Sequence, residues 1–197
     1  MNREDNIPRR ARDRSVRNIT LHIGDLLASK EPARIKTILG SCIAACLYDP
    51  TTGIGGMNHF LLPGDTDDPE LSTRYGVNAM EVLINEMMKL GARRSSIQAK
   101  VFGGGDIFRS NHPYMMVGAK NIRFVLGFLE TEGIPIVTSR VGGKQGMMVI
   151  YLPHVFEVYV KSLTTERFNT TEEKEFTYRR KLTQELTVPH SENVTLF

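Results

Sequence analysis

Two cysteines, Cys42 and Cys46, and five histidines are the side chains of this sequence with the most reactive chemistry. No Cys-x-x-Cys pair is present, so the sequence indicates neither a zinc site nor a dithiol site. On one strand, about 13 Å would separate the two cysteines, which is too far for a disulfide. We therefore expect free thiols, a reducing compartment and no metal site. The histidines are His22, His59, His112, His154 and His190.

Cys42 and His59 are the pair that a short hairpin would bring together. Asp49 to Gly53 carries Asp, Pro and Gly, which favour turn dihedrals, between two extended runs. The numbers of opposed residues in an antiparallel hairpin add to a constant. A constant of 101 places Cys42 directly opposite His59, with Cβ atoms about 4.5–5.5 Å apart. A constant of 103 makes them diagonal neighbours on one face, and only an even constant separates them.

A thiol and an imidazole in this arrangement would form an ion pair and supply a nucleophile. This matters because a free cysteine, with a pKa near 8.5, is only a few per cent thiolate at neutral pH. The bend at Gly40-Ser41 would let backbone N–H groups form an oxyanion hole. The alternative is that both cysteines are small core residues and His59 is a hydrogen-bonded strand residue. Spacing alone leaves both interpretations open.

The elements around this pair predict an α+β fold, a layered domain with a mixed, largely antiparallel, sandwich-like β core flanked by helices. Two amphipathic helices are expected, and Gly103-Gly104-Gly105 is expected to be a turn beside the active site because it lacks the spacing of a nucleotide loop. The expected strands are 35–39, 42–48, 54–62, 97–101, 134–137, 147–152 and 155–160, the first helix is 78–90 after a polar loop at 63–75, and the second contains 122–129 and stops at Gly133.

The domain organisation follows from composition. Residues 1–18 form an arginine-rich arm, 19–163 one globular domain, and 164–197 a polar tail. A formal net charge of +3 is too small to favour nucleic acid as a partner. No apolar run has the length of a signal peptide or membrane span, so we expect a cytoplasmic protein without membrane insertion.

Several motifs, in order along the chain, resemble the CheD family of chemoreceptor glutamine deamidases. The likeness covers roughly residues 19 to 163. The motifs are Leu39-Gly40-Ser41-Cys42-Ile43-Ala44, Leu47-Tyr48-Asp49-Pro50, Gly56-Met57-Asn58-His59-Phe60-Leu61-Leu62-Pro63, Tyr75-Gly76-Val77-Asn78-Ala79-Met80, Val101-Phe102-Gly103-Gly104, Phe128-Leu129-Glu130-Thr131-Glu132-Gly133-Ile134-Pro135 and Val141-Gly142-Gly143.

The resemblance implies that Cys42 is the nucleophile and His59 its base. The family's usual site adds a threonine six residues before the cysteine, a place that Lys36 occupies here. Thr37 stands five residues before, and on an unbroken strand Lys36 rather than Thr37 would share the face of Cys42. A bulge at Gly40-Ser41 would restore Thr37, which we take as the third candidate.

The activity that the resemblance implies is that of a cysteine-dependent amidohydrolase, a protein-glutamine glutaminase that needs no cofactor. Its substrate would be the helical cytoplasmic part of a chemoreceptor, and a CheC-type phosphatase is a further partner that some family members bind. Two other functions stay open from the sequence. One is a non-catalytic adaptor that binds receptor or phosphatase, and the other is a cysteine hydrolase acting on peptides or small amides.

Overall fold

The computed structural model describes residues 16–62, 69–106, 117–163 and 177–178. Most of the expected arginine-rich arm, part of the predicted polar loop, His112, His190 and most of the polar tail lie outside the described residues. The first strand, β1, already begins at Arg17, inside the segment expected to be the arm.

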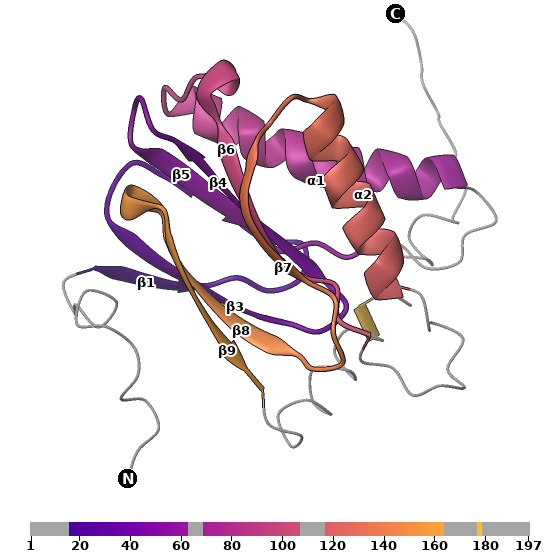
Figure 1. The fold of residues 1–197 in the computed structure, drawn as a ribbon. Helices are drawn as coiled ribbons and strands as arrows, with labels where there is room; N and C mark the ends of the chain where they lie inside the picture. Colours follow the sequence, from indigo (N-terminus) through magenta and orange to yellow (C-terminus); the bar gives the residue numbers. More distant parts are fainter. Residues whose placement is uncertain (1–15, 63–68, 107–116, 164–176, 179–197) are drawn as a thin grey trace, which may run out of the picture.

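The described residues form two β-sheets and two α-helices in three layers (Figure 1). One sheet has the strand order β1-β3-β8-β9, and the other has the order β2-β5-β4-β6-β7. Both helices pack on the second sheet, so the helices cover one side of the β core. The α+β prediction is confirmed. The elements are β1 (Arg17–Thr20), β2 (Leu26–Ser29), β3 (Ala33–Leu39), β4 (Ile43–Asp49), β5 (Ile54–Asn58), α1 (Pro69–Lys89), η2 (Arg94–Ser96), β6 (Gln98–Gly103), α2 (Val117–Thr131), β7 (Ile136–Val141), β8 (Met147–Leu152), η3 (Pro153–Val155) and β9 (Glu157–Ser162).

Strand β4 lies inside the molecule and is buried on both faces. Side chains of a strand alternate between its faces. Ile43 and Leu47 pack in the apolar layer between the second sheet and the helices. Cys42, just before the strand, and Cys46 pack in the layer between the two sheets. The prediction of free thiols is confirmed. Both thiols are buried, and Cys42 lies between the two sheets.

Several predicted boundaries differ from the structure; the strand expected over 54–62, for example, ends at Asn58. Helix α1 begins at Pro69, so the expectation of a loop through residue 75 was wrong. Proline suits the first turn of a helix, and the apolar periodicity that we followed starts only later in α1. Strand β7 extends to Val141 instead of ending at residue 137. Strand β9 begins at Glu157, because Pro153–Val155 forms a 3₁₀ turn before it.

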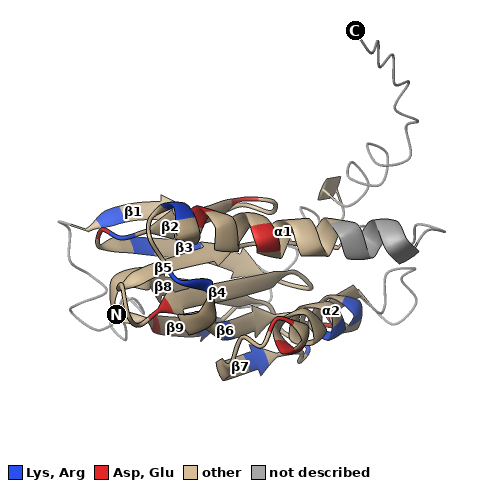
Figure 2. Cartoon of the chain, turned by 90° about the horizontal axis from the view of Figure 1, so that it is seen from above, with Lys and Arg blue, Asp and Glu red and all other residues tan. Residues whose placement is uncertain are grey.

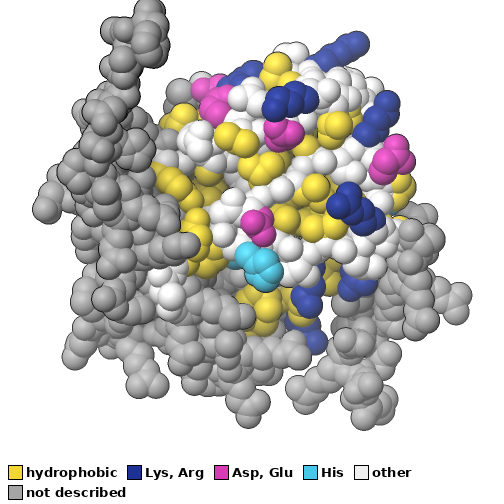
Figure 3. Space-filling view, turned by 180° about the vertical axis from the view of Figure 1, so that it is seen from behind, with side chains coloured by type: hydrophobic (Ala, Val, Ile, Leu, Met, Phe, Trp, Pro, Cys, Tyr) yellow, Lys and Arg dark blue, Asp and Glu magenta, His cyan; other side chains and the backbone are white. Residues whose placement is uncertain are grey.

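Basic and acidic residues are interspersed along the described elements (Figure 2). On the face drawn in Figure 3, hydrophobic side chains lie in scattered groups between acidic and basic ones. Within the described ranges, neither helix is long and apolar enough to cross a membrane, and His, Cys, Asp and Glu side chains form no cluster suited to a metal ion. Because charges of both signs are mixed, the charge distribution does not indicate which class of ligand the protein binds.

Candidate active site

The hairpin of β4 and β5 brings Cys42 and His59 to one face. The strands pair with Cys46 opposite Met57, so opposed residue numbers add to 103. Pairing continues to Ile43 and Phe60, whose backbones exchange two hydrogen bonds of 2.9 Å. Cys42 and His59 are therefore diagonal neighbours, in the second of the two predicted registers. Such neighbours have Cα atoms about 7–8 Å apart.

The turn that sets this register is held by Asp49, which is fully buried. Its carboxylate accepts hydrogen bonds from Thr51 N and Oγ1, from Thr52 Oγ1 and from Arg93 N, at 2.7–2.8 Å. Burial acts to raise the pKa of Asp49, but the hydrogen bonds, that of Arg93 first, hold it well below its usual range. Gly53 closes the turn with a φ of 72°. Local turn chemistry therefore aligns Cys42 with His59.

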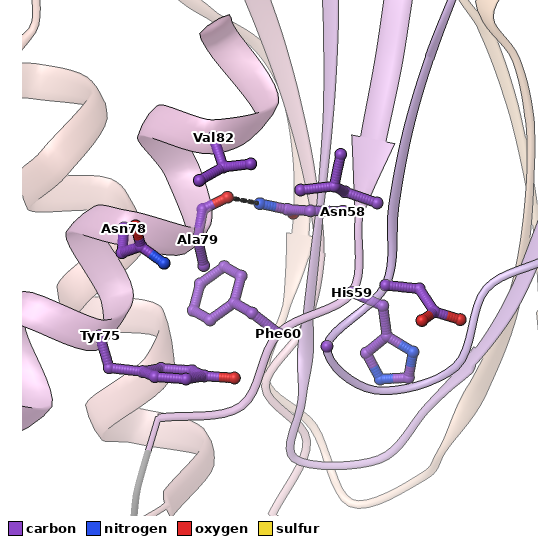
Figure 4. Close-up of a pocket in the computed structure, with 10 residues that line it drawn as sticks. Asn58, His59, Phe60, Tyr75, Asn78, Ala79 and Val82 are labelled. Carbon is purple, nitrogen blue, oxygen red and sulfur yellow. Dashed lines mark hydrogen bonds between the residues drawn. The ribbon is translucent and has the colours of Figure 1, made fainter. Parts of the chain in front are cut away.

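His59 follows β5 and is tied to the loop between β1 and β2. Its N–H donates to Asp25 O at 2.9 Å, and its carbonyl accepts from Gly24 N at 2.7 Å. Figure 4 shows Asn58 and Phe60 directed toward α1, while the His59 ring turns away from that helix. The side chain is only 3% exposed. The imidazole thus lies on the side of the strand that faces the first sheet.

Thr37 contacts His59 from the facing sheet. Thr37 lies in β3, whose residues alternate between buried and half-buried, and its side chain is fully buried. Thr37 Oγ1 lies 2.7 Å from His59 Nδ1 and donates to Leu21 O at 2.9 Å. A hydroxyl has one proton, so Nδ1 carries the proton of the first bond and donates it to Oγ1. His59 Nε2 then has the free lone pair.

Lys36 does not share the face of Cys42, because the strand is not unbroken between them. The break expected at Gly40 and Ser41 is where the chain crosses from β3 to β4, which belong to different sheets. Lys36 alternates with Thr37 and is half-buried on the other face of its sheet. The crossing, rather than a bulge, brings Thr37 to His59.

The proton-accepting atom of His59 is buried. Burial, acting first, lowers the pKa of His59 to about 4, while the Leu21 carbonyl and Asp25 oppose the shift. The imidazole is therefore neutral at pH 7, which differs from the resting ion pair that the spacing suggested. Within the described chain, Nε2 has no hydrogen-bond partner. A neutral imidazole with its lone pair on Nε2 is suited to accept a proton.

Beside His59 lies a pocket of about 170 Å³ between α1 and the start of β2 (Figure 4). Asn58, which sequence reasoning missed, forms part of its wall. Asn58 Oδ1 accepts from Ala45 N at 3.1 Å, and Nδ2 donates to Ala79 O at 3.0 Å, so the side chain links β4 to α1. The pocket is lined by Gly24, Asp25, Leu26, Asn58, His59, Phe60, Tyr75, Asn78, Ala79 and Val82.

Comparison with known proteins identifies similar sequences. Residues 61–162 match a family described as CheD chemotactic sensory transduction, a range that begins just after His59. A Bordetella petrii protein named probable chemoreceptor glutamine deamidase CheD is 50% identical over 70% of this chain, although the match spans only 62% of that protein. A Shewanella oneidensis protein named probable chemoreceptor glutamine deamidase CheD 1 is 40% identical over 98% of this chain and 94% of its own length.

Solved structures offer a more distant likeness. The crystal structure of the Bacillus licheniformis hypothetical protein YfiH matches 59% of this chain and 50% of its own, with a TM-score of 0.40 and 16% identity. A likeness this weak carries no argument about this chain.

Proposed function

Because this chain belongs to the CheD family, and the similar proteins of Bordetella and Shewanella bear the name chemoreceptor glutamine deamidase, we propose that it hydrolyses selected receptor glutamines to glutamate and ammonia. The observation that carries the chemistry is the buried 2.7 Å hydrogen bond between Thr37 Oγ1 and His59 Nδ1. This bond leaves the lone pair of Nε2 free, on a side chain that shares one face of the β4–β5 hairpin with Cys42. The proposed reaction is cysteine-dependent.

In the first half of the proposed reaction, His59 Nε2 takes the thiol proton of Cys42, and the sulfur attacks the carboxamide carbon of glutamine. Collapse of the tetrahedral intermediate breaks the C–N bond, and His59 gives its proton to the departing ammonia. In the second half, His59 removes a proton from water, which attacks the thioester. The products are glutamate and the regenerated thiol. Thr37 holds the imidazole in the required tautomer throughout.

We assign receptor contact to the pocket beside His59. Its wall combines apolar Phe60 and Val82 with polar Tyr75 and Asn78, a mixture that suits the face of an amphipathic helix. A chemoreceptor helix in the cytoplasm is the proposed partner. A CheC-type phosphatase is a second proposed partner, which would compete with the receptor if it binds the same wall.

The function is tested by incubating a purified chemoreceptor cytoplasmic fragment with the protein and mapping peptides by mass spectrometry. Each Gln-to-Glu change adds about 1 Da and releases one ammonia, since a hydroxyl group from water replaces the amide NH2. The receptor fragment alone is the control for spontaneous deamidation. Absence of both mass gain and ammonia, with the receptor bound, would instead support the non-catalytic adaptor. The complete burial of Cys42 is the observation that favours this alternative.

Thr37→Val is expected to lower kcat by about 10- to 100-fold, because leaving a buried donor or acceptor unsatisfied costs about 1–3 kcal/mol. The change removes the acceptor of Nδ1–H and the donor to Leu21 O. Thr37→Ser retains the hydroxyl and is the matched control. Lys36→Thr should have no effect, because that position faces away from His59. An active Thr37→Val, or a gain from Lys36→Thr, would contradict this role in the deamidation assay.

A further inference from the structure

The turn at residues 40–42, which carries Cys42, is held in place by hydrogen bonds to its backbone carbonyls. Gly40 O accepts from Gly105 N at 2.8 Å, and Cys42 O accepts from Gly104 N at 2.7 Å. Between them, Ser41 O accepts from Asn121 Nδ2 at 2.8 Å. Three consecutive carbonyls are thus each bound by a donor from outside the turn, and one of these donors is a side chain. Of the three glycines expected to form a turn, Gly104 and Gly105 lie against the segment of Cys42, while Gly103 ends β6.

Asn121 also reaches the chain that follows His59. It belongs to α2 and is fully buried, although its side chain is polar. Its Oδ1 accepts a hydrogen bond from Leu62 N at 3.0 Å. One amide therefore joins the turn before β4 to the segment three residues after His59. These are the two segments whose relative position decides whether Cys42 can pass a proton to His59.

The approach of α2 to this turn depends on glycine. A Cβ atom on Gly118, in the first turn of α2, would lie 2.4 Å from Gly104 O. A Cβ on Gly103, which has a φ of 108°, would lie 2.1 Å from Cys42 O. Neither approach is possible with a larger residue, because real Cβ contacts are never this short. The backbone is thus built to bring Asn121 against Ser41.

We propose that Asn121 is a positioning residue for Cys42. Only the expected effect of this residue on deamidation rests on the proposed function. In a trans peptide, the C=O of Ser41 and the N–H of Cys42 point in opposite directions. Asn121 therefore sets the plane of this peptide and with it the direction in which the Cys42 side chain leaves the backbone. A displacement near 1 Å at a reacting group costs about 100-fold in rate.

The test uses Asn121→Ala and Asn121→Asp in the full chain. Aspartate keeps the volume and an acceptor for Leu62 N–H but replaces the donor to Ser41 O. Both variants are expected to lower kcat by about 10- to 100-fold while KM stays within about twofold, because binding is not altered. Both should also shift the pH profile of Cys42 alkylation by iodoacetamide, followed on the Cys42 peptide by mass spectrometry.

Tyr151→Phe is the matched control, because Tyr151 is equally buried and loses one buried hydrogen bond, from its hydroxyl to Leu47 O, away from Cys42 and His59. It should lower Tm without changing kcat or the alkylation profile. If the Asn121 variants lower Tm but leave both readouts as in the wild type, Asn121 is structural and the proposal is overturned. If the wild type deamidates nothing, the proposed function fails, while the alkylation profile still decides the role of Asn121. Asn121→Asp keeps the test open should the alanine variant not fold.

Discussion

Replacing Cys42 with alanine is expected to abolish receptor deamidation, with a fall in kcat on the order of 10⁴-fold or more. The other thiol on this face, Cys46, stays protonated because burial raises its pKa, and His59 cannot act on the amide without a nucleophile. The fold should persist, since Cys42 is a small residue in an apolar layer and its loss costs about 1 kcal/mol. Mass spectrometry of the receptor fragment measures the activity, and circular dichroism checks the fold.

Cys46→Ala is the control that this strand provides. Cys46 is as buried as Cys42 and packs in the same layer between the sheets. Burial raises the pKa of the Cys46 thiol far above its ordinary value, with Lys100 opposing weakly, so it stays protonated. The control should therefore lose a little stability and keep its activity. Deamidation by the Cys42→Ala variant at the wild-type rate would rule out the covalent mechanism.

The relation between Cys42 and His59 could be predicted because it depends on local chemistry. Asp49 and Gly53 specify one tight turn, and a turn leaves only a few registers for the strands beside it. Both odd registers place Cys42 and His59 on one face, and the structure adopts one of them. The prediction needed no knowledge of how the two sheets pack.

The contact between Thr37 and His59 could not be predicted in this way. It depends on β3 and β4 joining different sheets, which is a matter of long-range pairing. Alternation along a strand gives the face of each residue but not the sheet that the face meets. An unbroken strand from 36 to 42 would have placed Lys36, not Thr37, on the face of Cys42. The family pattern, not periodicity, kept Thr37 among the candidates.

Asn121 left a signal that we had not used. In α2 it stands four residues after Val117 and four before Val125, on a stripe of buried residues. A polar residue in such a stripe must find hydrogen-bond partners, because an unpaired buried amide is costly. The sequence could thus have marked Asn121 as a buried hydrogen-bonding residue. Its partners, Ser41 and Leu62, come from distant segments and required the structure.

Replacing His59 with asparagine is expected to lower kcat by about 10²- to 10⁴-fold and to remove a pH dependence of stability. Asparagine keeps an N–H donor for Thr37 Oγ1 but has no titrating group. In the wild type, burial lowers the pKa of His59 to about 4, compared with about 6.5 in the unfolded chain. Between these values the unfolded state binds more protons, so stability falls as the pH falls.

The lowered pKa of His59 corresponds to about 3 kcal/mol in the free energy of unfolding. This stability is fully present above about pH 6.5 and is lost as the pH falls toward 4. Urea denaturation across this range should show the loss in the wild type and a smaller loss in His59→Asn. His22→Asn is the control, because His22 is exposed and lies in the loop that holds His59. This variant should keep most of the pH dependence of stability that the wild type shows. Equal slopes for wild type and His59→Asn would mean that His59 is not held neutral, and proton transfer from Cys42 would then need another acceptor.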